Sequence, residues 1–175
     1  SDLESGSLKA VVTGITSKNV KIEITYSFGV NDLFYTTSVK VTNLGDADIE
    51  AVRFARSFDP DQDQYKYGSY DTYNKVICNP DGTKPASETN YAMVVARGSK
   101  SLAGFFFLAF DNRARVSRGV DFDPNSAYLP GLSDTAPVTE KTFATDAAIE
   151  ITSENSNGYT REDNAIALTF HIGTM

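Results

Sequence analysis

The segment Val20-Lys-Ile-Glu-Ile-Thr-Tyr26 alternates apolar and polar residues along its whole length. This period of two is typical of a β-strand that buries one face, because successive side chains point to opposite sides of a sheet. The next segment, Phe34-Tyr-Thr-Thr-Ser-Val-Lys-Val-Thr42, repeats the pattern, and a turn-like run of residues 43–48 follows it. These segments predict consecutive antiparallel strands.

Similar segments continue to the end of the chain. We expect further strands at residues 49–54, 91–96, 102–110, 148–152 and 165–170. The segment Leu102-Ala-Gly-Phe-Phe-Phe-Leu-Ala-Phe110 is the most apolar and is expected to be a buried strand. No long segment shows a helical period, and residues 121–141 read as a long functional loop. The pattern predicts an all-β fold, an antiparallel β-sandwich with long functional loops.

The length and net charge of the chain limit the number of domains and the kinds of partner that we expect. At 175 residues the chain is long enough to bury a sizeable core, so residues 1–175 are expected to form a single domain. The net charge of −7 disfavours nucleic acid and anionic membranes as partners, because both attract basic surfaces. No apolar run approaches the roughly 20 residues that span a bilayer, so we expect no membrane insertion. Ser1 is not an initiator Met, and we expect a processed or excised fragment.

The best candidate for a binding site is an acidic loop at residues 57–74. Its sequence is Ser57-Phe-Asp-Pro-Asp-Gln-Asp-Gln-Tyr-Lys-Tyr-Gly-Ser-Tyr-Asp-Thr-Tyr-Asn74, which places Asp59, Asp61 and Asp63 at alternate positions. Carboxylates at this spacing gather oxygen ligands around a hard cation such as Ca²⁺. The loop lacks the full EF-hand pattern, so an ordinary surface turn stays open as the alternative.

A second acidic patch follows the most apolar segment. In Phe110-Asp-Asn-Arg-Ala-Arg115, Asp111 could complete the cation site, and Arg113 could hold a carboxylate through two hydrogen bonds. A surface turn with a solvated arginine is the alternative. The segment Asp121-Phe-Asp-Pro-Asn125 repeats the Asp-x-Asp-Pro motif, and there we prefer a turn to a second ion site.

Nothing in the sequence singles out a catalytic centre. His171 is the only histidine, which leaves no Ser-His-Asp arrangement and no histidine cluster for zinc. Acidic residues are plentiful, but no pair stands out as the two carboxylates of a glycosidase. Cys78 is the only cysteine and is expected to be a small apolar strand residue. We therefore expect a protein that is not an enzyme.

One combination of motifs is more specific than the rest. The run Arg56-Ser-Phe-Asp-Pro-Asp61 is followed by Gly68-Ser-Tyr-Asp-Thr-Tyr-Asn74. Further segments belong with it, namely Tyr35-Thr-Thr-Ser-Val-Lys-Val-Thr-Asn-Leu-Gly-Asp46, Asp111-Asn-Arg-Ala-Arg-Val-Ser117 and Ala165-Ile-Ala-Leu-Thr-Phe-His-Ile-Gly-Thr174. Together they span most of the chain, and the chain resembles the ligand-binding (peptide-binding) domain of large bacterial RTX adhesins, which are Ca²⁺-dependent surface proteins.

This resemblance implies an extracellular module on the bacterial cell surface, near the distal end of a long adhesin. It implies Ca²⁺ in a surface pocket and the capture of short peptides or protein C-termini on host or neighbouring cells, with a role in biofilm formation. The matching positions imply Ca²⁺ ligands at Asp59, Asp61, Asn74 and Asp111 and a peptide pocket lined by Gly68, Ser69, Tyr70 and Arg113. The tyrosine-rich residues 62–67 depart from the family pattern.

Four hypotheses follow. The first is a monomeric peptide-binding module within a larger adhesin, which needs an open cation position beside a donor-rich pocket. The second is a Ca²⁺-dependent carbohydrate-binding module, in which Tyr65, Tyr67 or Tyr70 would stack on a sugar ring. The third is a structural spacer with fully enclosed ions, and an enzyme comes fourth.

Overall fold

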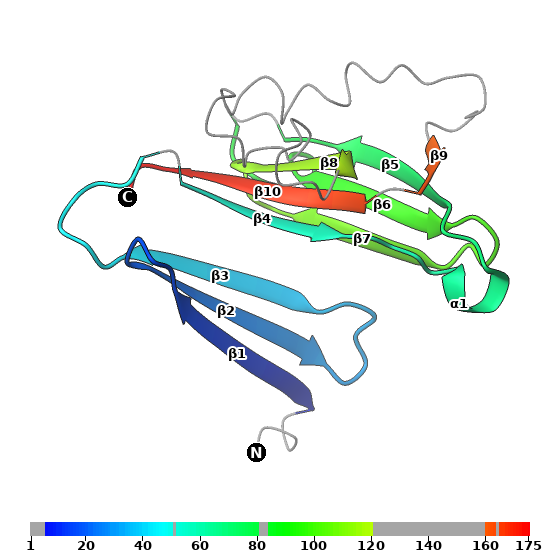
Figure 1. Ribbon diagram of the computed structural model, residues 1–175, viewed down its shortest axis with the longest axis horizontal. Coiled ribbons are helices and arrows are strands. Elements are labelled where there is room, and N and C mark those ends of the chain that lie inside the picture. Colours follow the sequence, from blue (N-terminus) through cyan, green and yellow to red (C-terminus); the bar gives the residue numbers. More distant parts are fainter. Residues whose placement is uncertain (1–5, 51, 81–83, 121–159, 164) are drawn as a thin grey trace. The chain divides into compact units, whose positions relative to one another are not determined.

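The computed structural model describes residues 6–50, 52–80, 84–120, 160–163 and 165–175 (Figure 1). This part of the chain is almost entirely β, in three antiparallel sheets, which confirms the predicted all-β class. Contacts divide the chain into two compact units, Ser1–Val52 with Gly173–Met175 and Arg53–Ile172. The expectation of a single domain over residues 1–175 stays a prediction. No helix among the described residues is long and apolar enough to cross a membrane.

The first unit contains a sheet with the strand order β1-β2-β3. Its strands are β1 (Ser7–Ile15), β2 (Val20–Gly29) and β3 (Thr36–Asn43). The β1–β2 turn contains Asn19 at a φ of 58°, a left-handed conformation that asparagine tolerates. Near the end of the chain, Met175 and Ile49 exchange two backbone hydrogen bonds of 2.9 and 3.0 Å. The alternating segments at residues 20–26 and 34–42 thus correspond to β2 and β3, as predicted.

The second unit contains two sheets, with the strand orders β4-β10-β8 and β7-β6-β5-β9. Apart from the strand-end residues Val52 and Gly173, which belong to the first unit, its elements are β4 (Val52–Phe58), α1 (Gln64–Tyr67), β5 (Thr72–Cys78), β6 (Ala92–Gly98), β7 (Gly104–Ala109), β8 (Ala114–Val120), β9 (Thr160–Glu162) and β10 (Ala165–Gly173). In the described residues, α1 is the only helix, in keeping with the missing helical period. Strand β5 begins inside the predicted acidic loop.

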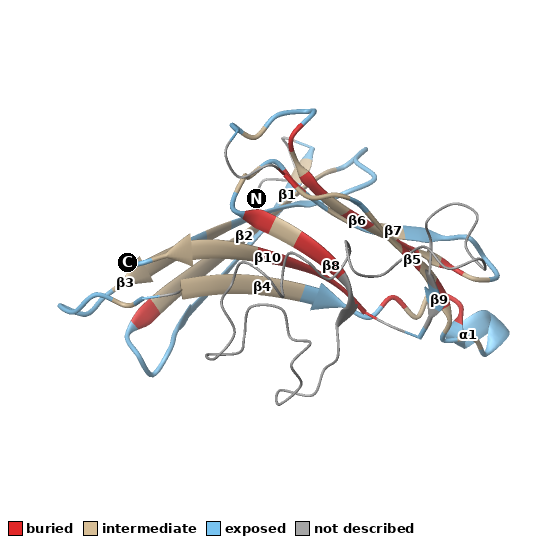
Figure 2. Ribbon diagram, turned by 90° about the horizontal axis from the view of Figure 1, so that it is seen from above, coloured by how far each residue is buried: buried red, intermediate tan, exposed pale blue. Residues whose placement is uncertain are grey.

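The two sheets of the second unit share one apolar core. Its buried members come from both sheets: Ala92, Val94, Ala96, Ala109, Ala114, Val116, Ile166 and Leu168. Figure 2 shows the buried stretches along β6, β8 and β10. Two sheets that cover each other's apolar face form a sandwich-like unit, which agrees with the predicted architecture.

One predicted strand differs from expectation in its burial. Strand β7 lies at the edge of its sheet, where Phe105 and Phe107 pack against the core, whereas 42% of Phe106 is exposed. The segment was expected to be buried, but only one of its faces meets the core. The predicted strand at residues 148–152, the loop at 121–141 and the Asp-x-Asp-Pro repeat at 121–125 lie outside the described residues.

Candidate metal centre

The β4–β5 connection (residues 59–71) places the acidic residues. Its first residues turn tightly, because the N–H of Asp61 donates to the carbonyl of Asp59 at 3.1 Å, and that of Gln64 donates to the carbonyl of Asp61 at 3.1 Å. Helix α1 follows and ends at Gly68, whose φ of 63° is a left-handed conformation that favours glycine. Pro60 is buried between the two aspartates. The connection is therefore compact and anchored.

Three carboxylates converge beside this connection. Oxygen atoms of Asp59, Asp61 and Asp163 all lie within 4.8 Å of one another. Asp163 lies between β9 and β10, so it reaches the cluster from a distant part of the sequence. Carboxylate oxygens are the ligands that hard cations prefer, and this cluster could hold a metal ion.

The electrostatics of the cluster favour a positive partner. Partial desolvation, followed by the negative charges of Asp61 and Asp163, raises the pKa of Asp59 above its ordinary value. Desolvation and then the charge of Asp163 raise the pKa of Asp61 in the same way. In addition, Oδ1 of Asp61 is buried and has no hydrogen-bond partner among the described residues. A buried carboxylate oxygen without a donor is costly, and a bound cation would remove that cost.

Asp63 shares the alternate spacing but does not join the cluster. Only 1% of the residue is exposed, and its carboxylate accepts hydrogen bonds from the backbone N–H groups of Lys100 and Ser101. Desolvation alone would raise its pKa. The hydrogen bonds from Ser101 and Lys100, with the positive charge of Lys100, instead lower the pKa below its ordinary value. Asp63 is thus a structural acceptor in the β4–β5 connection.

Asn74 lies on β5 and is buried. Its Oδ1 accepts a hydrogen bond of 3.1 Å from the hydroxyl of Thr72, and its backbone pairs with Ala96 of β6. Only 2% of the residue is exposed. The predicted role of Asn74 as a metal ligand stays a prediction.

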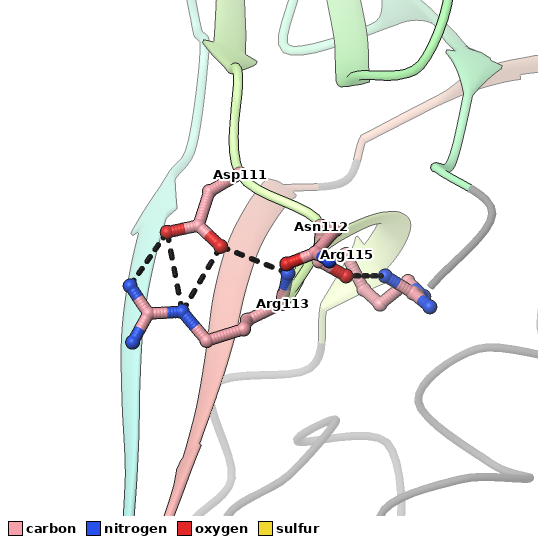
Figure 3. Close-up of polar contacts among 4 residues, drawn as sticks. All are labelled: Asp111, Asn112, Arg113 and Arg115. Atoms are coloured by element: carbon pink, nitrogen blue, oxygen red, sulfur yellow. Dashed lines mark hydrogen bonds and ion pairs between the residues drawn. The ribbon is translucent and has the colours of Figure 1, made fainter. Parts of the chain in front are cut away.

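Asp111 and Arg113 contact each other in the β7–β8 connection, directly before β8. Figure 3 shows the guanidinium turned toward the carboxylate, with Nη2 at 2.7 Å from Oδ2 and Nε at 3.0 Å from Oδ1. The hydrogen bond from Arg113 lowers the pKa of Asp111 despite some desolvation. Among the described residues, the acidic cluster does not include Asp111. Asp111, which the sequence assigned to the cation, and Arg113, which it assigned to the peptide ligand, therefore form an ion pair with each other.

The other predicted pocket residues follow α1 directly. The hydroxyls of Ser69 and Ser99 lie 3.2 Å apart, and Nε2 of Gln64 donates to the hydroxyl of Tyr70 at 3.3 Å. Gly68 ends the helix, as described above. These contacts position the segment, while its role in peptide binding stays a prediction.

Sequence reasoning missed Asp163 as a member of the cluster. The available signal was its place directly before the predicted strand at residues 165–170, since strand ends hold side chains in fixed positions. Comparisons with protein-family models, curated proteins and solved structures gave no significant match for this chain. The candidate site therefore rests on its own geometry and on the motifs in the sequence.

Proposed function

We propose that this chain is an extracellular Ca²⁺-dependent peptide-binding module of a large bacterial RTX adhesin. It would mediate attachment to host or neighbouring cells, and biofilm formation, by capturing peptide C-termini. The observation that carries the proposal is the convergence of Asp59, Asp61 and Asp163 within 4.8 Å. The sequence resemblance supports the adhesin assignment, and the acidic character of the chain is compatible with a cation-dependent surface protein.

The choice of Ca²⁺ rests on the chemistry of the donors. All three side chains offer hard oxygen atoms, and the cluster includes no histidine or cysteine, which zinc and copper favour. Ca²⁺ accepts roughly six to eight oxygen ligands in a flexible geometry. Three carboxylates therefore leave coordination positions for water or for a ligand. A bound Ca²⁺ would supply positive charge at this surface. The carboxylates of Asp59, Asp61 and Asp163 would hold it.

A peptide C-terminus fits this chemistry because its carboxylate is an anionic oxygen donor. The chain carries a net charge of −7, so long-range attraction would favour basic ligands over acidic ones. Only a locally positive site would select a carboxylate. The proposal can therefore be tested by removing only the negative charge at the C-terminus of a peptide.

The test compares one peptide as the free acid and as the C-terminal amide, by calorimetry in the same Ca²⁺ buffer. We expect the amide to lose most of the affinity and EDTA to abolish the binding of both. Equal affinity of the acid and the amide would refute carboxylate capture. Binding of the free acid that survives EDTA would refute the dependence on Ca²⁺.

A carbohydrate-binding module is the second candidate, favoured by a group of exposed tyrosines. Tyr65 on α1 is fully exposed, and about half of Tyr67 and of Tyr70 is exposed. Tyrosine rings with a free face stack on sugar rings, and Ca²⁺ can hold sugar hydroxyls. A glycan array run beside a peptide array, each with and without Ca²⁺, separates the two candidates.

A further inference from the structure

The carboxylate of Asp63 joins two turns that are separate in the sequence. Asp63 lies directly before α1, yet its side chain makes no capping bond to that helix. It instead accepts N–H groups from the β6–β7 turn (residues 99–103), where the N–H of Ser101 lies 3.1 Å from Oδ1 and 3.2 Å from Oδ2. A charged acceptor with several backbone donors forms hydrogen bonds about twice as strong as neutral ones.

The surroundings of Asp63 are shaped to receive it. A Cβ atom on Gly98 would lie 2.8 Å from Oδ2 of Asp63 and 2.7 Å from the hydroxyl of Ser101, so the glycine leaves room for the carboxylate in its observed position. The neighbouring Gln62 donates from Nε2 to the carbonyls of Ala96 and Ala103, each at 3.3 Å. Two consecutive side chains of the β4–β5 connection are thus bonded to the end of the β6–β7 hairpin.

We propose that Asp63 is a positioning residue for the candidate metal centre, and that it orders the β4–β5 connection before any cation binds. This inference rests on the proposed function. Asp59 and Asp61 repel each other and Asp163, so an unanchored connection would move its carboxylates apart. The anchor at Asp63 opposes that movement. A preorganised site binds more tightly because less conformational freedom is lost on binding.

Two variants remove the anchor in different ways. Asp63→Asn keeps the size of the side chain but replaces one acceptor oxygen with an N–H₂ group facing the backbone donors. Gly98→Ala changes no charge and instead adds a methyl group too close to the carboxylate of Asp63 and the hydroxyl of Ser101, so that these side chains must shift. Gly104→Ala is the matched control on the same hairpin, because a Cβ there meets no atom within 4 Å.

The first readout is hydrogen exchange in EDTA. The N–H groups of Lys100 and Ser101 should exchange slowly in the wild-type protein without any cation, and faster in Asp63→Asn and Gly98→Ala. Gly104→Ala should match the wild type. Fast exchange of both groups in the cation-free wild type would overturn the proposal, and this measurement needs no variant to fold.

The second readout is cation binding to the full chain. We expect the Ca²⁺ dissociation constant to rise at least tenfold in both anchor variants and to stay unchanged in Gly104→Ala. The luminescence lifetime of bound Tb³⁺, compared in H₂O and D₂O, should report additional coordinated water in the anchor variants, which a change in fold stability alone would not produce. Unchanged Ca²⁺ affinity in both anchor variants would overturn the positioning role while leaving the proposed function intact. A wild-type chain that binds neither ion would overturn both.

Discussion

Arg113 holds the carboxylate of Asp111 through two parallel contacts, from Nη2 to Oδ2 at 2.7 Å and from Nε to Oδ1 at 3.0 Å. The pair is partly exposed to solvent, with 57% of the Arg113 side chain and 27% of the Asp111 side chain accessible. Exposed pairs contribute little to stability, about 1 kcal/mol or less. The geometry has a larger consequence for binding, because it decides which groups are available to a cation and to a ligand.

Asp111→Asn should leave the Ca²⁺ affinity essentially unchanged. The carboxylate of Asp111 is engaged by Arg113 and is not part of the cluster of Asp59, Asp61 and Asp163 within the described residues. Calorimetric titration of Ca²⁺ into the variant measures this directly. A large loss of affinity would show that Asp111 is a ligand, as the sequence resemblance implies.

Arg113→Lys should weaken the binding of free-acid peptides. Asp111 engages Nε and one N–H of Nη2, so the outer N–H groups on Nη1 and Nη2 are the ones that can form a two-pronged contact with a peptide carboxylate. A lysine keeps the positive charge but cannot form that contact. We expect a loss of about tenfold, equivalent to about 1.4 kcal/mol. Ca²⁺ affinity measured in the absence of peptide serves as the control and should not change. Peptide binding at the wild-type level would remove Arg113 from the ligand site.

Ca²⁺ should raise the thermal stability of the protein. A ligand that binds only the folded state contributes about 2.7 kcal/mol when its free concentration is 100 times the dissociation constant. Melting curves in EDTA and in millimolar Ca²⁺ measure the effect, and NaCl at the same ionic strength is the control. Superimposable curves in EDTA and Ca²⁺ would contradict a metal centre.

Asp61→Asn should have opposite effects on stability with and without the cation. In EDTA the variant should melt at a higher temperature than the wild type, because one of three mutually repelling charges is gone. In Ca²⁺ it should melt lower, because a charged ligand is lost. A variant that melts below the wild type in both buffers would show that the Asp61 carboxylate stabilises the fold by itself.

Ca²⁺ affinity should fall on mild acidification. Protons compete with the cation for the oxygens of Asp59 and Asp61, whose pKa values lie above the ordinary value of about 3.9. The loss should therefore begin at a higher pH than for ordinary aspartates. Titrations at successive pH values test this, and an affinity that stays constant down to the ordinary aspartate pKa would contradict it.

The same pKa shifts predict that the stability of the cation-free protein changes with pH in the opposite direction to its Ca²⁺ affinity. A carboxyl group whose pKa is raised in the folded state binds its proton more tightly there than in the unfolded chain. Its contribution to the free energy of unfolding is therefore lost as pH rises through the raised pKa. Asp63 and Asp111 have lowered pKa values and act in the opposite direction. The melting temperatures of the wild type and of Asp61→Asn should be compared at successive pH values. Their difference measures how much the cluster contributes to the pH dependence of stability.

The strands were predictable because the burial of a strand in a sheet produces a local pattern of apolar residues in the sequence. The alternation in residues 20–26 lies within β2, and the apolar run at residues 165–170 lies within β10. Strand β5 was missed because its first residues continue the polar composition of the acidic loop. Thr72 and Asn74 are nevertheless buried, and the hydroxyl of Thr72 donates to Oδ1 of Asn74, which pairs these two polar atoms inside the unit.

The candidate site was predictable only in part. Asp59 and Asp61 follow from their spacing and their motif, but Asp163 depends on tertiary structure that no local pattern encodes. The same spacing suggested Asp63 as an equivalent third carboxylate. The tight turn and α1 instead direct it to the β6–β7 turn, where backbone N–H groups bind it. Sequence spacing therefore identified the right connection but not the complete set of carboxylates.

Strand β9 is only 3 residues long and pairs with Thr72, Tyr73 and Asn74, the first part of β5. Beyond that point no described strand pairs with this side of β5. A bare strand edge is a template on which a second molecule can add its own strand. Here the register shifts between Val76 and Cys78, and Lys75 lies just before the shift. A bulge twists a strand, and a charged lysine disfavours the addition of a further strand, so the described part of β5 carries two features that oppose pairing with a neighbouring copy.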